Sequence, residues 1–184
     1  MPEKDDILYR RFLDSDTASY DALMLRYGDS LTIYLQAILH DWQDAEDMMI
    51  EAFARIMVKK PRIKEEAFKA YLFKTARNLA FRFLSRKHAD VFSLDDLTYE
   101  PTASEYIEKR LVEEEQKQIL HLCLDRIDPV LKEALWLIYF EDMSYAQAAE
   151  IMKVNTKKID HFLTRAKHKL REELLKEGIS HAHE

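Results

Sequence analysis

The sequence predicts an all-α protein built from two small helical domains that are joined by a flexible acidic linker. Glycine occurs only twice and proline four times in 184 residues, so few positions interrupt a helix. Alternating runs of β-branched residues, which would indicate strands, are absent, whereas apolar residues recur at helical spacing along most of the chain. Hydrophobic residues make up 47% of the sequence, which is enough to build a core in each domain.

Four helices are expected before the linker. An amphipathic segment over residues 7–13 precedes a longer helix that opens near residues 15–17. A third helix is expected over residues 44–59 and a fourth over residues 65–87, with a basic loop between them. The predicted apolar face of the second helix consists of Tyr20, Leu23, Tyr27, Leu31, Tyr34 and Ile38. That of the third consists of Ala45, Met48, Met49, Ala52, Phe53 and Ile56.

The helical pattern breaks after the fourth helix. Residues 89–104 are acidic and contain Pro101, and we interpret them as a linker between a first domain, 1–88, and a second domain, 105–178. Residues 179–184 are expected to form a tail.

The second domain is expected to begin with a helix over about residues 104–126. The next helix has Asp128 as its N-cap and Pro129 at its first helical position, where the missing N–H of proline costs nothing. Gly178 is suited to closing the last helix, because glycine adopts the left-handed conformation that helix ends require.

Residues 144–169 carry the pattern of a helix-turn-helix. Ser144 and Gln147 are spaced as a capping box at the start of the first helix, and a short turn leads to Asn155 or Thr156 as the cap of the second. The first helix carries the mostly small apolar residues Ala148, Ala149, Ile151 and Met152. The second repeats apolar residues at Ile159, Leu163, Ala166 and Leu170.

The other face of this second helix combines cations with short hydrogen-bonding side chains. It presents Thr156, Lys157, Lys158, His161, Thr164, Arg165 and His168. Such a mixture suits phosphates and base edges in the major groove of DNA. A solvated helix face has the same composition, but the spacing and the turn together favour DNA binding.

Charge is unevenly distributed along the chain, whose net charge is −6. Residues 55–90 carry 11 basic and 3 acidic side chains, and residues 151–184 carry 8 basic and 5 acidic side chains. Both remaining stretches are acidic. Two basic blocks in an acidic protein predict two local anion-binding surfaces, and the acidic remainder limits indiscriminate adhesion to nucleic acid.

Aromatic and basic side chains interleave over residues 68–87. The rings are Phe68, Tyr71, Phe73, Phe81 and Phe83, too many for one narrow apolar stripe on a helix. Some are therefore expected near the surface, where unpaired bases stack on rings while cations follow the phosphates. A well-buried helix with snorkelling cations is the alternative.

Several functional classes are disfavoured. Neither glycine lies in a phosphate-cradling loop, and the single Cys123, which lies among aliphatic residues, permits no intrachain disulfide. No segment has the length of a bilayer span or the apolar centre of a signal peptide. We therefore expect a cytoplasmic protein with no membrane insertion, no bound metal and no cofactor.

Taken together, these pieces resemble an extracytoplasmic-function (ECF) sigma factor of bacterial RNA polymerase. The resemblance rests on DAEDMMIEAFARIM at residues 44–57, FKAYLFKTARNLA at residues 68–80, and the C-terminal domain at residues 111–174. It implies a non-enzymatic subunit that binds core RNA polymerase, reads the minus-ten and minus-thirty-five elements of promoter DNA, and aids DNA melting. It also implies that an anti-sigma factor holds the free protein.

The resemblance assigns site residues by position. The acids on the third helix, which would bind core polymerase, are Asp44, Glu46, Asp47 and Glu51. The residues for the minus-ten element, where a base flips out into a pocket, are Arg62, Ile63, Lys64, Tyr71, Arg77 and Asn78. The residues for the minus-thirty-five element are Thr156, Lys157, Lys158, His161, Thr164 and Arg165.

Two residues depart from the family pattern, because Asp160 and Phe162 stand where many members have lysine and arginine. Asp160 is suited to accepting from a cytosine amine, to capping a neighbouring cation, or to facing away from DNA. Phe162 either extends the core or touches a thymine methyl group.

Two other classes of function compete with a sigma factor. A stand-alone helix-turn-helix regulator would use only the second domain and leaves the aromatics and cations of residues 59–87 unexplained. An enzyme on a helical bundle has only scattered histidines in its favour. A carboxylate metal site on the third helix lacks the paired Glu-x-x-His arrangement of di-metal bundles.

Overall fold

The computed structural model describes residues 2–91 and 115–179, and every regular element among them is a helix. The predicted all-α class is therefore confirmed for the described residues. The chain divides into two compact units, Met1–Glu100 and Pro101–Glu184. No described helix is long and apolar enough to cross a membrane.

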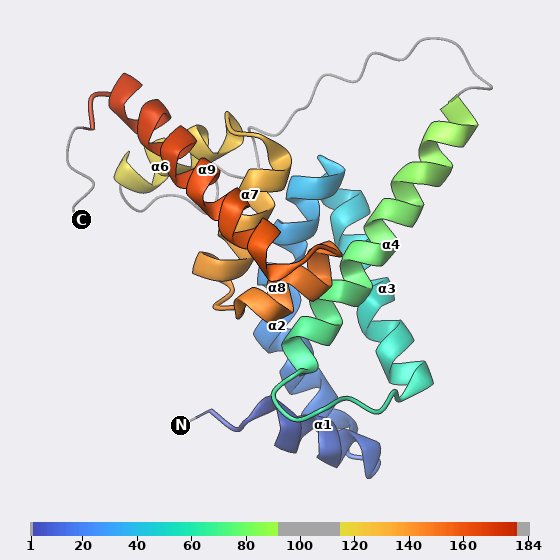
Figure 1. The fold of residues 1–184 in the computed structure, drawn as a ribbon. Helices are drawn as coiled ribbons and strands as arrows, with labels where there is room; N and C mark the ends of the chain where they lie inside the picture. Colours follow the sequence, from blue (N-terminus) through green and yellow to red (C-terminus); the bar gives the residue numbers. More distant parts are fainter. Residues whose placement is uncertain (1, 92–114, 180–184) are drawn as a thin grey trace. The chain divides into compact units, whose positions relative to one another are not determined.

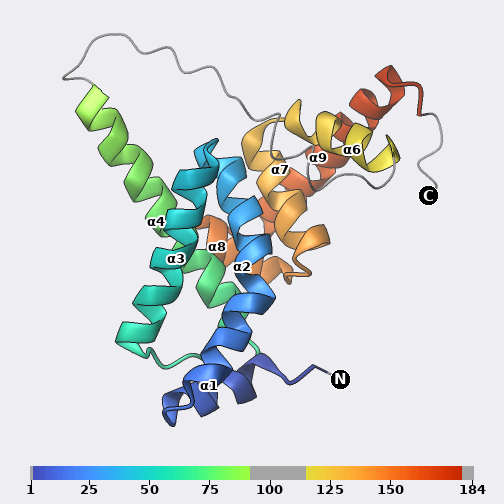
Figure 2. The same ribbon diagram turned by 180° about the vertical axis from the view of Figure 1, so that it is seen from behind.

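Within its described residues, 2–91, the first unit contains four helices, arranged as shown in Figures 1 and 2. Its helices are α1 (Asp5–Leu13), α2 (Thr17–Leu39), α3 (Trp42–Lys59) and α4 (Phe68–Val91). Helices α2, α3 and α4 pack against one another, and α1 packs on α2 and α4 at the end of the bundle where the chain passes from α3 to α4. We refer to residues 60–67 as the α3–α4 loop.

The predicted apolar faces form the core of this unit. On α2, Tyr20, Leu23, Leu31 and Tyr34 are buried as predicted, whereas Tyr27 and Ile38 are half-buried. On α3, Ala45, Ala52, Phe53 and Ile56 are buried, whereas Met48 and Met49 are half-buried. The Tyr20 hydroxyl donates to the Phe53 carbonyl at 2.6 Å, so this buried polar group has a hydrogen-bond partner.

Helix boundaries differ from the prediction where a backbone conformation overrides periodicity. Helix α3 begins at Trp42 because the Asp41 carboxylate accepts from the Asp44 amide at 2.9 Å, making Asp41 the N-cap. Helix α4 begins at Phe68 rather than at residue 65, since Glu66 has a φ of 57°, which no α-helix contains. It ends at Val91, inside the range predicted as linker. The rest of that range lies outside the described residues.

Buried tyrosines predict that the first unit loses stability in alkali. Burial raises the pKa of Tyr9 to about 12 and raises the pKa of Tyr20 and Tyr27 as well. The unfolded chain ionises its tyrosines near the ordinary value of about 10, so the unfolded state gains charge first. The free energy of unfolding should therefore be unaffected below pH about 10 and fall as the pH rises towards about 12.

Denaturant titrations across this pH window measure the effect directly. Tyr9→Phe removes one of the three groups, so its stability should decline less steeply with pH than that of the parent protein. An unfolding free energy that stays level through the window would show that these hydroxyls ionise freely in the folded state.

The second unit is built around its last helix. Its helices are α6 (Glu115–Asp125), α7 (Pro129–Leu135), the π-helical turn η1 (Trp136–Phe140), α8 (Tyr145–Met152) and α9 (Thr156–Lys176). Helix α9 packs against α6, α7 and α8. The core includes Leu131, Leu137, Ile151 and Leu163, together with Cys123, whose burial raises its thiol pKa. The part of the helix predicted for residues 104–114 lies outside the described residues.

The predicted caps of the second unit are confirmed. The Asp128 carboxylate accepts from the Val130 amide ahead of Pro129, and Ser144 and Gln147 form both bonds of the capping box. Asn155, rather than Thr156, caps α9 by accepting from the Lys158 amide at 2.8 Å. Gly178 follows α9 with a φ of 80°, as a closing glycine should.

The π-helical turn was not predicted. Leu137 accepts from the Met143 amide and Trp136 from the Glu141 amide, so the end of this helix is wider than an α-helix. The Trp136 ring stacks on Phe140 with centroids 4.4 Å apart, and its indole N–H donates to Glu141 at 3.2 Å. This turn lies immediately before the helix-turn-helix. Helical periodicity in the sequence does not predict it.

Candidate nucleic-acid interface

A small open pocket lies in the first unit where the end of α3, the α3–α4 loop and α4 meet. Its lining consists of Arg55, Ile56, Lys59, Pro61, Tyr71, Thr75, Asn78, Leu79 and Arg82. The volume is about 170 Å³, well below the roughly 300–1,000 Å³ of sites for drug-sized ligands. The pocket therefore matches a single planar ring better than a larger small molecule.

The spacing of residues on α4 explains how this lining forms. Tyr71, Thr75, Asn78 and Arg82 follow one another at steps of four, three and four residues, so they lie on one face of the helix. The Thr75 hydroxyl donates to the Tyr71 carbonyl at 2.8 Å, which leaves the ring and the Asn78 amide as the groups that face a ligand.

The chemistry of the pocket suits an unpaired base with its phosphate. The Tyr71 side chain is 37% exposed, and an open ring offers a stacking platform. The Asn78 amide offers both a donor and an acceptor to a base edge. Lys59 and Arg82 are exposed cations beside it, whereas Arg55 is already paired with Glu51 at 2.7 Å.

The six residues expected at the minus-ten element are brought together only in part. Tyr71 and Asn78 line the pocket. Arg62, Ile63 and Lys64 lie on the α3–α4 loop, next to the lining residue Pro61, with both cations exposed.

Arg77 lies away from this lining. Its guanidinium lies 4.5 Å from the centroid of the Phe81 ring. Consecutive residues of an α-helix point about 100° apart, so Arg77 and Asn78 face in different directions. Asn78, the next residue, faces the pocket instead.

Sequence reasoning missed part of the pocket. Thr75 and Arg82 could have been found from their helical spacing to Tyr71, but Arg55 and Lys59 reach the pocket only because α3 packs beside α4.

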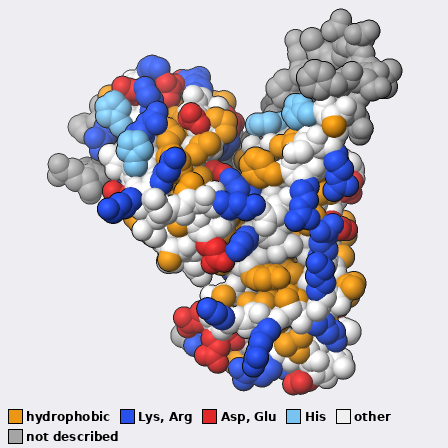
Figure 3. Space-filling model, turned by 45° about the vertical axis from the view of Figure 1, so that its right-hand side comes forward, with side chains coloured by type: hydrophobic (Ala, Val, Ile, Leu, Met, Phe, Trp, Pro, Cys, Tyr) orange, Lys and Arg blue, Asp and Glu red, His pale blue; other side chains and the backbone are white. Residues whose placement is uncertain are grey.

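The aromatic rings of α4 divide between the core and the surface. Phe68 and Phe73 are fully buried, Phe83 is half-buried, and Tyr71 and Phe81 are exposed. The expectation that some rings lie near the surface is therefore confirmed. Figure 3 shows Lys and Arg side chains gathered in a column on the side of the first unit where α4 lies. Open rings and a line of cations on one side are the features of a single-strand binding surface.

The four acids expected to bind polymerase lie in two settings on α3. Asp44 pairs with Lys87 of α4 at 3.1 Å, and Glu51 pairs with Arg55. Glu46 and Asp47 are exposed, and within the described residues neither forms an ion pair with a cation. Glu46 and Asp47 are therefore the two of these four acids that have no cation partner in the described residues, and they are open to a partner's basic groups.

Aliphatic side chains on α3 add an apolar component that sequence reasoning missed. Ile50 is 54% exposed, Met57 43% and Val58 83%. An apolar centre with a charged rim is the usual composition of a protein interface. The signal was present in the sequence, because these residues fall outside the predicted buried stripe.

All six residues expected to read the minus-thirty-five element are exposed on the first turns of α9. The opposite face buries Ile159, Leu163 and Ala166 against the rest of the unit. Lys157, Lys158 and Arg165 form no ion pair with a carboxylate among the described residues. This end of the helix therefore presents uncompensated positive charge.

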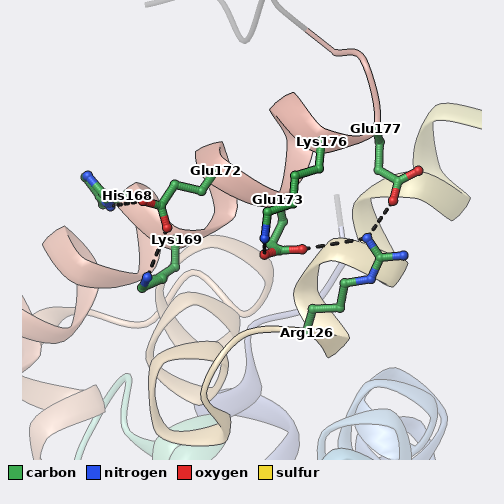
Figure 4. Close-up of polar contacts among 7 residues, drawn as sticks. All are labelled: Arg126, His168, Lys169, Glu172, Glu173, Lys176 and Glu177. Atoms are coloured by element: carbon green, nitrogen blue, oxygen red, sulfur yellow. Dashed lines mark hydrogen bonds and ion pairs between the residues drawn. The ribbon is translucent and has the colours of Figure 1, made fainter.

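The other end of α9 is neutralised by its own acids (Figure 4). Glu172 pairs with Lys169 at 3.0 Å and with His168 at 3.5 Å, and Glu173 pairs with Lys176. Arg126, just after α6, pairs with Glu173 and Glu177. Lys167, which lies over the Tyr139 ring, and Arg171 are the cations of this half that form no ion pair with a described carboxylate.

The two residues that depart from the family pattern lie on this charged half. Asp160 is exposed, and within the described residues it caps no cation by an ion pair. Phe162 is half-buried, and its ring lies 6.0 Å from the Lys158 ammonium. Phe162 is therefore partly buried and lies beside a cation of the exposed face of α9.

The described residues contain no group of three or more histidine, cysteine or carboxylate side chains placed to hold a metal ion. Burial lowers the pKa of His121.

Two family patterns match the chain. Sigma-70 region 2 matches residues 23–89, which include the pocket, and Sigma-70 region 4 matches residues 117–170, which include the helix-turn-helix. The region 2 match therefore lies in the first unit and the region 4 match in the second.

Individual relatives agree with these matches. The ECF RNA polymerase sigma factor SigM of Bacillus subtilis is 25% identical over 151 residues, covering 82% of this chain and 92% of SigM. The RNA polymerase sigma-H factor of Pseudomonas aeruginosa is 26% identical over 161 residues, covering 82% of this chain and 83% of that factor.

A solved structure shares the fold. The sigma factor RpoE of Bartonella quintana, crystallised in complex with the anti-sigma factor NepR, superimposes with a TM-score of 0.69 at 21% identity. The match covers 85% of this chain and 96% of the other.

Proposed function

We propose how the two units share the work of transcription initiation, from the premise that this chain belongs to the ECF sigma factors of the sigma-70 family and directs bacterial RNA polymerase to promoters. It is a non-enzymatic subunit, so its chemistry consists of binding and strand capture. The first unit captures the minus-ten element, and the second unit reads the minus-thirty-five element.

The pocket beside α4 is the observation that carries the first assignment. A flipped base stacks on Tyr71 and hydrogen bonds to Asn78, while Lys59 and Arg82 neutralise the neighbouring phosphates. Arg62, Ile63 and Lys64 contact the strand from the loop. Capturing an unpaired base makes strand separation less unfavourable, so melting requires no covalent step.

The second unit places the first half of α9 in the major groove. Lys157, Lys158 and Arg165 contact phosphates, while Thr156, His161 and Thr164 approach base edges or sugars. A reading helix with moderate charge is sufficient, because polymerase and the first unit share the binding energy for the promoter.

Helix α3 docks on core polymerase through Glu46 and Asp47 at the rim and Ile50 and Val58 at the centre. The paired acids Asp44 and Glu51 hold the side chains of α3 and α4 in place beside this surface. We further propose that the protein acts in the cytoplasm, and that an anti-sigma factor covers these surfaces when it is inactive.

A stand-alone helix-turn-helix regulator, the alternative that the sequence left open, is not supported by the matches to both sigma regions. It would use the second unit alone and would give no role to a base-sized pocket in the first. The two functions differ in whether core polymerase is required.

Run-off transcription with purified core polymerase distinguishes them. We expect the full chain to bind core polymerase and to direct specific transcripts from a two-element promoter, with transcripts lost when either element is scrambled. Duplex binding with sequence preference but without association with core polymerase would establish the regulator instead.

A further inference from the structure

Helix α1 holds the α3–α4 loop at both ends. The loop leaves α3 at Lys60 and reaches α4 through Glu66, and these residues have φ values of 43° and 57°. Left-handed conformations are unfavourable for residues with a Cβ atom and persist where the surroundings fix them. In this loop, both corners contact residues of α1.

The first corner, at Lys60, is held by two aromatic residues of α1. The Tyr9 hydroxyl donates to the Pro61 carbonyl at 2.8 Å, and the Lys60 ammonium lies 5.0 Å from the centroid of the Phe12 ring. Tyr9 is buried, and its ring packs 5.3 Å from that of Phe68, the first residue of α4. A buried hydroxyl with one carbonyl partner is a fixed contact rather than a surface encounter.

The second corner is held by a carboxylate. Both oxygens of Asp6 accept from the Glu66 amide, at 2.9 and 3.0 Å. The bond to an ionised carboxylate is stronger than a neutral one. It satisfies the Glu66 amide, a backbone donor that lies outside the helix.

The residues between the two corners are the ones proposed to contact DNA. Arg62 and Lys64 are exposed, and Ile63 is half-buried. Helix α1 itself precedes the residues that match Sigma-70 region 2, which begin at residue 23. Nothing in that match assigns α1 a role.

We propose that Asp6 and Tyr9 are positioning residues for promoter recognition, which set the shape of the α3–α4 loop and thereby its preference among minus-ten bases. The inference rests on the proposed role of the loop in minus-ten recognition. Both act through the backbone, so they affect discrimination between bases rather than attachment to polymerase.

The test uses the full chain bound to core polymerase and single-stranded minus-ten oligonucleotides that differ at one base. Asp6→Ala and Tyr9→Phe together should reduce the ratio of affinities between preferred and substituted bases about three- to tenfold, as expected for one or two hydrogen bonds. Affinity for core polymerase and the thermal midpoint should change little.

Matched variants separate the hydrogen bond from other effects of Asp6. Asp6→Asn removes the charge but keeps an acceptor, so it should retain discrimination and the slow hydrogen exchange of the Glu66 amide, both of which Asp6→Ala loses. Asp14→Ala removes an exposed carboxylate at the C-cap of α1, which forms no side-chain hydrogen bond or ion pair among the described residues, and should behave like the parent protein.

The outcomes are distinguishable from failure of the proposed function. If Arg62→Ala and Lys64→Ala change discrimination but the Asp6 and Tyr9 variants do not, the positioning role is wrong. If none of these variants changes discrimination, the loop does not read the minus-ten element. Loss of polymerase binding in the Asp6 and Tyr9 variants would show that α1 supports the whole unit, which also overturns the inference.

Discussion

Replacing Tyr71 and Asn78 together with alanine is expected to reduce promoter opening about a hundredfold while leaving binding to core polymerase intact. Stacking of a base on an aromatic ring contributes about 1–3 kcal/mol, and the amide contacts contribute about 1 kcal/mol. A combined loss of about 3 kcal/mol corresponds to about two orders of magnitude. Fluorescence of a base analogue in the minus-ten strand measures opening directly.

Single and conservative variants show which group is responsible. Tyr71→Phe keeps the ring and should retain most of the opening, whereas Asn78→Ala alone should have an intermediate effect. Arg77→Ala tests the neighbouring face of α4, where the guanidinium lies over Phe81. If it equalled the Tyr71 and Asn78 double variant in effect, the strand would follow that face rather than the pocket. Loss of polymerase binding in any of them would contradict the assignment of this face to DNA.

Replacing Lys157, Lys158 and Arg165 with alanine is expected to produce the second large effect. Each cation that neutralises a phosphate contributes about 0.9 to the slope of log affinity against log salt concentration. The triple variant should therefore bind minus-thirty-five duplex with a slope reduced by roughly 2 to 3 units. Binding of the holoenzyme over a range of salt concentrations gives this slope.

The same helix supplies the control. Lys169 and Lys176 pair with Glu172 and Glu173 on α9 itself (Figure 4), so replacing both with alanine should leave the slope nearly unchanged. An equal reduction from both sets would show that DNA runs along the whole helix. An unchanged slope in the triple variant would remove the second unit from phosphate binding.

Much of the fold could be predicted because helix periodicity and capping are local properties. The capping box at Ser144 and Gln147, the proline start after Asp128, and the closing Gly178 are all decided by residues within one turn. The all-α class followed from the scarcity of glycine and proline together with the apolar spacing. These signals require no knowledge of which helices meet.

The rest depends on contacts between distant residues. The late start of α4 reflects the left-handed Glu66, whose amide is bound by Asp6 sixty residues earlier in the chain, and no window of local sequence contains both. The same holds for Arg55 and Lys59, which reach the pocket from a different helix than Tyr71. The ion pair between Asp44 and Lys87 joins two helices as well. Local sequence therefore does not show that Asp44 has a cation partner whereas Glu46 has none.

The arrangement of α9 has a consequence for how such a protein diversifies. Its reading face points away from the buried Ile159 and Leu163, and its free cations make no ion pair with the described carboxylates. Substitutions there alter few contacts on which folding depends. Duplicated copies of the gene can therefore drift to new target sites at little cost in stability, whereas the loop held by α1 is tied to a second helix and should change more slowly.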